Sequence, residues 1–234
     1  MSGVISNTIV TDGLILYYDG ANPQCYVSGD TTSNDLSITQ STGTLTNGVT
    51  YDTDNNGSWV FDGIDDYIEI SDNEIFNDIE YNKPFTFSIW TTPTTLSGVK
   101  ILLGKRNGAT GKGLYLGFNN NTLRWGMVTL PFASYTINTT TTYSINNLYH
   151  IVGTFDGSDA TGLNIYVNKI LQSSTIDFNN PMGTILTTTP VTIGAGNAEF
   201  YSTGEIYSAK IYNRELTQEE ITQNYNAMKS RFNL

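Results

Sequence analysis

Paired carboxylates are the groups that hydrolyse glycosidic bonds, and two groups of acidic residues in the sequence have to be weighed as such a pair. Such a pair must face each other across the scissile bond. Glu199 and Glu205 are six residues apart, but the Ser-Thr-Gly between them is typical of a turn. Asp65, Asp66 and Glu69 lie in a stretch that is typical of a structural hairpin. Neither group predicts a catalytic pair, and we expect the chain not to be an enzyme.

The single histidine, His150, is the only residue on which a Ser-His-Asp triad could depend. It lies within "LYHIVGTF", residues 148–155, a segment typical of a strand. With no second histidine, a His-rich metal site cannot form. We therefore expect His150 to be a structural strand residue.

Calcium is the metal that the sequence accommodates best, because hard cations take carboxylate and carbonyl oxygens from loops. Asp19, Asn22 and Asp35 follow the first expected strand and are the candidate ligands, and Asp156 with Asp159 forms another cluster. Asp and Asn are equally the residues of tight turns, and the EF-hand spacing is absent. Calcium is thus an optional ligand, and no cofactor is expected to be required.

An exposed aromatic ring beside hydrogen-bonding groups can carry the apolar face of a pyranose. Trp125 with Arg124, in "NNTLRWGM", and Tyr135, in "PFASYTI", are the candidates for such a ligand-binding site. The alternative is that Trp125 packs between two sheets, as we expect for Trp59 and Trp90, because large aromatic side chains are mostly buried. The sequence leaves these two interpretations open.

The charge and hydropathy of the chain exclude several classes of partner. Lys and Arg total 11 against 22 Asp and Glu, and a net charge of −11 repels phosphate backbones, so we expect no nucleic acid. No apolar run approaches the ~18 residues that span a bilayer, so we expect no membrane insertion. The opening "MSGVISNTIV" lacks the features of a signal peptide, which predicts synthesis in a cytoplasm. Cys25 stands alone, which excludes an internal disulfide and a cysteine-based metal cluster.

Short strands are the elements that must position these groups. In "FTFSIW", Phe85, Phe87 and Ile89 share one face, and "DYIEI" and "LNIYVN" alternate in the same way. Two antiparallel sheets packed face to face are the expected result. We expect one domain over residues 1–234, in which residues 1–12 form an N-terminal arm or an edge strand.

Turn residues separate the expected strands. Asp62-Gly63 and Asp156-Gly157 each follow an apolar run, and Asp-Gly is a strong hairpin signal. Asn119 to Asn121 supply residues that tolerate a left-handed backbone. Each of these three places is therefore expected to reverse the chain between neighbouring strands.

One amphipathic helix is expected near the end of the chain, over residues 217–230. Thr217 and Glu220 have the spacing of a capping box, and Leu216 that of a hydrophobic staple. The apolar stripe of this helix consists of Ile221, Tyr225 and Met228. We expect the helix to seal one end of the sandwich, with docking of a partner as the alternative.

The order of these segments resembles the concanavalin A-like lectin/glucanase domains of the laminin G-like type. The resemblance covers residues 13–232 and is carried by "GLILYYDGANPQCY", "FTFSIWTTP", "LYHIVGTFDG", "LNIYVNKILQSS" and "GEIYSAKIYNRELTQEEITQNYNAMKSRF". It implies an all-β, two-sheet antiparallel jelly-roll sandwich with one short C-terminal helix. Glucanases of the family usually carry Glu-x-Asp-x-x-Glu on one strand, and this spacing is absent here. Many of its domains bind calcium, but their ligands vary.

The segments "LYYDGANP" and "IYNRELTQEEITQNYNA" are similar to those of such domains in structural proteins of tailed bacteriophages. This resemblance implies a non-catalytic, lectin-like virion structural module: a capsid decoration, head-fibre or tail-associated protein. Its expected location is the virion, and its expected partners are other virion proteins and surface glycans of a host or the environment, with a homo-oligomer as a further option. The alternatives are a free-standing carbohydrate-binding module and, less favoured, a glycan-degrading enzyme.

Overall fold

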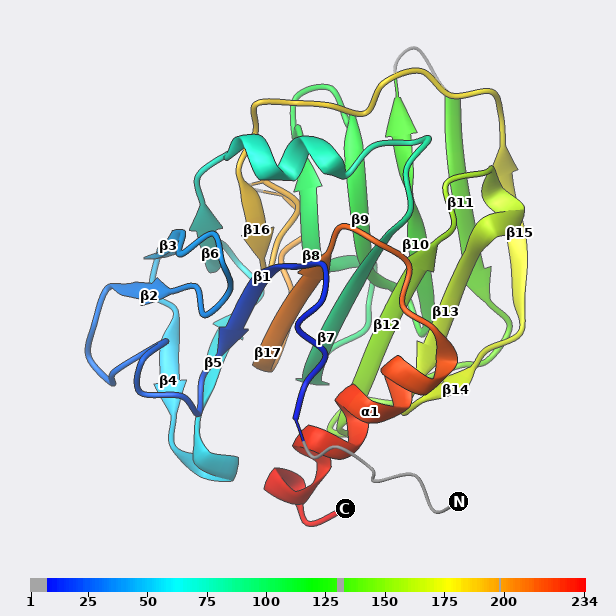
Figure 1. Cartoon of the computed structure of the whole chain (residues 1–234). Helices are drawn as coiled ribbons and strands as arrows, with labels where there is room; N and C mark the ends of the chain where they lie inside the picture. Colours follow the sequence, from blue (N-terminus) through cyan, green and yellow to red (C-terminus); the bar gives the residue numbers. More distant parts are fainter. Residues whose placement is uncertain (1–7, 130–132, 198) are drawn as a thin grey trace.

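Two antiparallel sheets lie face to face in the computed structural model, which describes residues 8–129, 133–197 and 199–234 (Figure 1). One α-helix lies outside them. The predicted all-β, two-sheet jelly-roll sandwich with a C-terminal helix is therefore confirmed. None of the described helices has the length and apolar run that crossing a membrane requires.

The first sheet has eight strands. Its long central strand, β17, pairs with β7 along one edge and with β5 and then β1 along the other. In spatial order the strands are β14 (Ile170–Leu171), β13 (Leu163–Val167), β12 (Tyr149–Phe155), β7 (Phe85–Pro93), β17 (Thr203–Tyr212), β5 (Ser58–Asp62) and β4 (Thr50–Asp52), with β1 (Leu14–Asp19) beside β17.

The second sheet has nine strands and begins at an edge strand whose residues are all exposed. Its order is β15 (Ser174–Asn179), β11 (Ala133–Thr139), β10 (Thr122–Thr129), β9 (Gly113–Asn119), β8 (Val99–Arg106), β16 (Val191–Ile193), β6 (Tyr67–Ile70), β3 (Thr42–Thr46) and β2 (Thr32–Asn34). Short 3₁₀ helices interrupt the loops at η1 (Asp54–Asn56), η2 (Glu74–Asp78), η3 (Ala160–Gly162) and η4 (Ser230–Phe232).

The main core lies between the two sheets and follows the predicted alternation. Phe85, Phe87 and Ile89 point inward from β7 and are fully buried there with Trp59. Successive side chains of a strand point to opposite faces, so the alternate residues of β7 face outward. One of these is Trp90, which lies outside the sandwich core, beneath the helix, in a cluster with Tyr207, Met228 and Phe232. The prediction that Trp90 packs between the sheets is therefore wrong.

Two of the three predicted chain reversals are confirmed. Asn120 and Asn121 connect β9 to β10, and Asn120 has the left-handed φ of 53° that such a short loop needs. The loop that starts at Asp156-Gly157 joins β12 to its neighbour β13. The third prediction is wrong, because β5 and β6 on either side of Asp62-Gly63 belong to different sheets.

Side chains close this third turn and redirect the chain. The Asp62 carboxylate accepts the backbone N–H of Ile64 at 2.8 Å, and the Asp66 carboxylate accepts that of Asp62 at 3.0 Å. These bonds replace the ladder bonds of a hairpin, so the chain leaves one sheet and enters the other. A dipeptide turn signal indicates a reversal but does not say which strand comes next.

The helix α1 (Gln218–Lys229) packs on the outer face of the eight-stranded sheet, across β17, β7 and β12 (Figure 1). Its capping box between Thr217 and Glu220 is confirmed. Leu216 and Ile221 share one buried cluster, as expected of a staple. The prediction that the helix seals one end of the sandwich is wrong. Its apolar stripe instead packs against the outward-facing side chains of the strands.

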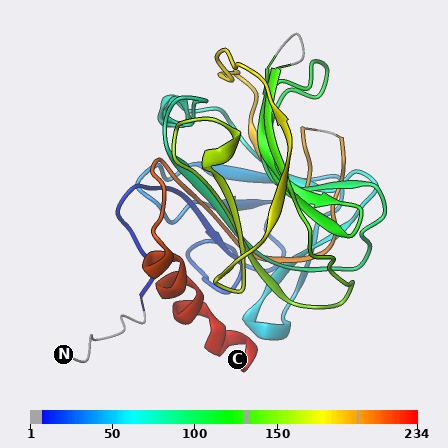
Figure 2. The same ribbon diagram turned by 90° about the vertical axis from the view of Figure 1, so that its right-hand side faces the viewer.

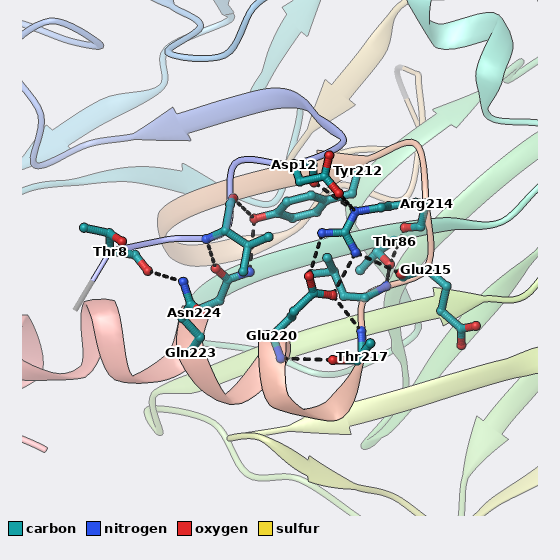
Figure 3. Close-up of polar contacts among 12 residues, drawn as sticks. Thr8, Asp12, Thr86, Tyr212, Arg214, Glu215, Thr217, Glu220, Gln223 and Asn224 are labelled. Carbon is teal, nitrogen blue, oxygen red and sulfur yellow. Dashed lines mark hydrogen bonds and ion pairs between the residues drawn. The ribbon is translucent and has the colours of Figure 1, made fainter. Parts of the chain in front are cut away.

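The segment before β1 lies against this helix (Figure 3). The Val10 N–H donates to Asn224 Oδ1 at 2.8 Å, and the Val10 carbonyl accepts the Tyr212 hydroxyl at 3.1 Å. The Gln223 amide donates to the Thr8 carbonyl. The described part of the expected arm, residues 8–12, is thus held by the helix and is not an edge strand, and residues 1–7 lie outside the described residues.

Candidate functional site

The outer face of the nine-stranded sheet lies on the opposite side of the sandwich from α1. Figure 2 shows the helix, in red, on one side and β9–β11, in green, on the other. Along β10, Leu123, Trp125 and Met127 belong to the core between the sheets. Arg124 and Val128, which alternate with them, therefore point outward. This outward face can receive a ligand without displacing the helix.

Trp125 is fully buried, so it cannot present a ring to a sugar at the surface. Its indole Nε1–H donates to the Thr154 carbonyl at 2.9 Å, and its ring centroid lies 5.6 Å from that of Phe85 and 5.2 Å from that of Phe87. The prediction that Trp125 stacks on a sugar is therefore wrong, and the alternative, in which Trp125 packs between the sheets, is confirmed.

Tyr135 also faces the core. It is 8% exposed, and its ring packs against Phe155 with the centroids 6.4 Å apart. Of the three sequence-predicted ligand-binding residues, only Arg124 lies on the outward face. Trp125 and Tyr135 therefore do not belong to one site with it.

Arg124 lines a hollow of about 200 Å³ on this outward face. Three strands and one loop contribute to the lining, which combines two cations, two aromatic rings and aliphatic side chains: Val99, Ile101, Arg106, Tyr115, Arg124, Val128 and Phe200. Gly117 is paired with Arg124 and Gly126 with Tyr115 in the strand register. No side chain rises from these two glycine positions, so the long side chains can lie across the sheet.

Three larger hollows lie elsewhere. Two of them, of about 410 and 450 Å³, include residues of the 34–40 loop and have no lysine, arginine or aromatic side chain in their lining. The third, of about 230 Å³, lies beside the start of the helix and contains Tyr166 but no lysine or arginine. The hollow at Arg124 is therefore the one of these four that offers both an aromatic ring and charged hydrogen-bond donors.

Each arginine of the hollow is held by a carboxylate. Arg106 forms an ion pair with Glu199, and Arg124 forms one with Asp177 of the edge strand β15. The side chains of Arg106 and Arg124 are 15% and 18% exposed, whereas those of Glu199 and Asp177 are 30% and 37% exposed. The acids thus lie nearer to solvent than the guanidinium groups that they hold.

Tyr115 lies within the electrostatic reach of both arginines. Burial raises the pKa of the Tyr115 phenol, and the positive charges of Arg124 and Arg106 oppose that rise. Burial lowers the pKa of the Arg106 guanidinium, but an arginine remains a cation at any physiological pH. The hollow therefore holds a phenol together with two permanent positive charges.

Phe200 supplies the exposed aromatic ring of the hollow. It is 38% exposed, and the Arg106 guanidinium carbon lies 5.1 Å from its ring centroid. Its φ of 56° is in the left-handed region, which a bulky residue rarely adopts. Unfavourable backbone conformations of this kind gather at ligand-binding positions.

The predicted calcium ligands Asp19, Asn22 and Asp35 already have partners within the protein. Asp19 forms an ion pair with Arg231, with Oδ1 and Nη1 2.8 Å apart, and Asn22 accepts the Gln24 N–H at 2.9 Å. Asp35 Oδ1 accepts backbone N–H groups of Tyr17 and Ser37, and its Oδ2 accepts the Ser37 and Thr39 hydroxyls. Asp156 and Asp159 likewise accept nearby Ser and Thr groups. Apart from the Asp19–Arg231 ion pair, these interactions are typical of Asp and Asn in turns.

The carboxylates of Asp62, Asp65 and Asp66 form a better candidate site for a cation. Oxygen atoms of Asp62, Asp65 and Asp66 lie within 4.8 Å of one another. Asp66 is only 3% exposed, and within the described residues its Oδ1 has no hydrogen-bond partner. Burial raises the pKa of Asp66, and the hydrogen bond from the Asp62 N–H offsets only part of that rise. A cation beside the unpartnered Oδ1 would favour the charged carboxylate further.

His150 is buried beneath the helix, which confirms its structural role. Its Nε2 lies 2.9 Å from the Ser88 hydroxyl, and its ring stacks on Trp90 with the centroids 4.8 Å apart. Burial lowers the pKa of His150 to about 3, with the nearby charge of Lys210 acting in the same direction. A neutral, enclosed imidazole of this kind is not placed to act on a ligand at the surface.

The sequence itself matches a known family over most of its length. Residues 61–222 match the family described as the concanavalin A-like lectin/glucanases superfamily. The chain belongs to this superfamily. No curated protein matches the sequence of this superfamily member.

Solved structures share the fold of this superfamily member at low identity. The binding domain of Paraclostridial Mosquitocidal Protein 1 is 19% identical, with a TM-score of 0.70, over 91% of this chain and 52% of that chain. The binding domain of botulinum neurotoxin serotype G is 18% identical, with a TM-score of 0.67, over 91% and 50%. The Trypanosoma rangeli sialidase, solved with the inhibitor DANA, is 16% identical, with a TM-score of 0.64, over 93% and 33%. The chain thus spans about half of the toxin binding domains and a third of the sialidase chain.

Sequence reasoning missed Arg106, Tyr115 and Phe200. The alternation of "GLYLGFN" in β9 could have placed Tyr115 on the outward face, since Leu114 and Leu116 belong to the core and Tyr115 lies between them. Phe200 lies in a loop, and no periodic pattern of the sequence could have placed it.

Proposed function

We propose that the chain is a lectin-like, non-catalytic module that binds a glycan on the outer face of its nine-stranded sheet. The observation that carries this proposal is the hollow in which the exposed Phe200 ring lies beside Arg106, Tyr115 and Arg124. An aromatic ring beside fixed hydrogen-bond donors matches the two sides of a sugar, one apolar and one rich in hydroxyls.

The position of the helix adds to this proposal. On the other sheet, Ile221, Met228 and Phe232 bury the outer face of the strands. The face that carries Arg124 is therefore the broad sheet surface left to a ligand. The similar solved structures include binding domains of clostridial toxins, and one of these is in complex with rat synaptotagmin II. A protein receptor is accordingly the second ligand class to test.

A glycan array tests the proposal directly, with Phe200→Ala as the critical variant. We expect binding to be reduced about tenfold or more by Phe200→Ala, because the sugar loses its stacking surface. Phe178→Ala is the matched control: Phe178 is 47% exposed on the neighbouring edge strand and does not line the hollow. Absence of any glycan binding by the wild-type protein would reject the proposal, as would an equal loss in the two variants.

The module is proposed to be non-catalytic on two grounds. The Glu-x-Asp-x-x-Glu spacing is absent from the sequence, and the carboxylates beside the hollow, Glu199 and Asp177, are each paired with an arginine. Hydrolysis needs two carboxylates that face each other across the scissile bond, and each of these two faces an arginine instead. Incubation with a panel of polysaccharides should release no products, and any hydrolysis that is lost on Glu199→Gln or Asp177→Asn would overturn this assignment.

A narrower proposal is that the module belongs to a virion, as a capsid decoration, head-fibre or tail-associated protein. It rests on the resemblance of "LYYDGANP" and of the helix sequence to phage structural proteins. Other virion proteins would then be partners, and a homo-oligomer would fit a symmetry axis of the particle. Mass spectrometry of purified particles from the source should detect the chain, and its absence would leave the free-standing carbohydrate-binding module.

A further inference from the structure

Two of the arginines in this acidic chain lie together in the hollow on the outer face of the nine-stranded sheet. The sequence has four arginines in a chain of net charge −11. Arg214 forms ion pairs with Asp12 and Glu220, and Arg231 forms one with Asp19, so these two hold the C-terminal helix. The other two, Arg106 and Arg124, both line the hollow on the outer face of the nine-stranded sheet.

The hydrogen-bonding capacity of these two arginines is only partly used. Arg124 Nη2 donates to Asp177 and, at 3.5 Å, to the Thr136 hydroxyl, while its Nε has no partner among the described residues. Arg106 pairs with Glu199 and likewise has no partner for its Nε within that part of the chain. A guanidinium has five N–H donors in a fixed plane, so each arginine retains donors for an anion with two acceptor oxygens side by side.

Both guanidinium groups share the hollow with the Tyr115 phenol. The Arg106 guanidinium carbon lies 6.0 Å from the ring centroid of Tyr115, and the positive charges of Arg106 and Arg124 both act on the phenol. Among the described residues, no group accepts a hydrogen bond from the Tyr115 hydroxyl. An anion placed at this hydroxyl would therefore gain one neutral donor and two charged ones, and such charge-assisted bonds are the stronger kind.

From this geometry we infer that the hollow binds an acidic sugar, one that carries a carboxylate or a sulfate. The anionic group lies between Arg106 and Arg124 and accepts from the Tyr115 hydroxyl, while the ring of the sugar stacks on Phe200. Glu199 and Asp177, the more exposed partners, turn toward solvent as the ligand replaces them. The volume of about 200 Å³ suits one sugar unit of a longer chain. This inference rests on the proposed function and specifies its ligand class.

Ion pairs on a sheet can also serve the fold alone, and Arg124 does tie the edge strand β15 to β10. A purely structural role predicts that loss of either arginine lowers the melting temperature and affects every ligand equally. A role in recognition predicts a loss that depends on the charge of the ligand. Affinities for matched pairs of acidic and neutral ligands therefore distinguish the two roles.

The experiment compares matched glycan pairs by isothermal titration calorimetry: sialylated with desialylated, uronic acid with the parent hexose, and sulfated with unsulfated. We expect the acidic member to bind about tenfold or more tightly, and the difference to fall as salt concentration rises. Arg106→Lys and Arg124→Lys should each remove most of this difference, because an ammonium cannot make the planar, two-bond contact. Lys112→Ala, which removes a cation from the β8–β9 connection outside the hollow, should preserve it.

Tyr115→Phe removes only the hydroxyl and leaves the fold intact. It should weaken the acidic member several-fold with an unchanged melting temperature. Equal affinity for both members of every pair, together with a loss on Phe200→Ala, would overturn the acidic-sugar inference and leave the proposed function in place. A loss of acidic and neutral ligands alike in the arginine variants would also overturn it. Absence of binding to every glycan would reject the proposed function itself.

Discussion

Arg231, in the 3₁₀ turn that follows the helix, forms an ion pair with Asp19, the last residue of β1, with Nη1 and Oδ1 2.8 Å apart. The two side chains are only 8% and 13% exposed. Arg231 also donates to the carbonyls of Asn55 and Gly57, in the loop that leads into β5. One guanidinium thus joins three segments that are far apart in the sequence.

Replacing Arg231 by alanine should destabilise the fold by roughly 3 kcal/mol, since it leaves Asp19 buried without its partner. Urea denaturation followed by tryptophan fluorescence measures this change. Lys229→Ala is the matched control, because it removes a positive charge from the same end of the helix, and it should cost about 0.5 kcal/mol or less. Equal losses in the two variants would show that net charge, and not this ion pair, is responsible.

The capping box gives a second prediction. Thr217 Oγ1 accepts the Glu220 N–H at 3.3 Å, and Glu220 in turn accepts the Thr217 N–H at 3.0 Å (Figure 3). Thr217→Ala should lower the free energy of unfolding by about 1 kcal/mol. Thr222→Ala makes the same substitution one turn later and should change stability by about 0.5 kcal/mol or less, because alanine is the better helix former there.

Trp125 and Arg124 are neighbours with opposite expected phenotypes. Trp125→Phe should cost roughly 2–3 kcal/mol, because it opens a gap in the core and deprives the Thr154 carbonyl of its donor. Glycan affinity of the folded protein should not change. Arg124→Lys should have the reverse effect, with a loss of affinity and little change in stability. Loss of glycan binding by folded Trp125→Phe would restore Trp125 to the site.

His150 should make stability fall in acid. Its pKa is about 3 in the folded protein against the usual 6.5, so the unfolded state binds more protons between these values. The stabilising contribution of neutral His150 is complete above pH 6.5 and is lost as the pH falls toward 3, at about 1.4 kcal/mol per unit at most.

Denaturation curves of the wild type and His150→Gln, compared at each pH, isolate this contribution from that of the carboxylates. The wild type should lose stability relative to the variant below pH 6.5. Parallel pH profiles for the two proteins would mean that His150 is accessible to protons in the folded state.

We expect calcium to bind at Asp62, Asp65 and Asp66, since Asp66 Oδ1 is buried and lacks a partner among the described residues. We expect added calcium to raise the melting temperature, a chelator to reverse the rise, and Asp65→Asn to abolish it. Asn22→Ala is the control and should leave the rise intact. The opposite pattern would return the calcium site to the loop after β1.

Most of the fold was predictable from the sequence because of strand alternation and helix capping. Phe85, Phe87 and Ile89 could be assigned to one buried face because a two-residue period admits no other arrangement. The helix was predictable because its capping box and staple involve residues close together in sequence. Its docking site was not, because contacts such as Asn224 with Val10 join distant segments.

The candidate site was predictable in part. Arg124 and Trp125 are adjacent on one strand and must face opposite ways, so alternation allowed only one of them at an outer surface. What no local pattern could supply is the meeting of β8, β9, β10 and the loop at Phe200, which depends on strand order. A site assembled from several strands is a property of the topology.

The central position of β17 has a consequence for how the chain reaches this structure. β17 pairs with β7, β5 and β1, all of which precede it by more than a hundred residues. During synthesis the earlier strands of this sheet are therefore made while the strand that joins them is still missing. Closure of the sheet must wait until Tyr212 has left the ribosome, and until then β1, β5 and β7 expose unpaired edges to which chaperones or other nascent chains can bind.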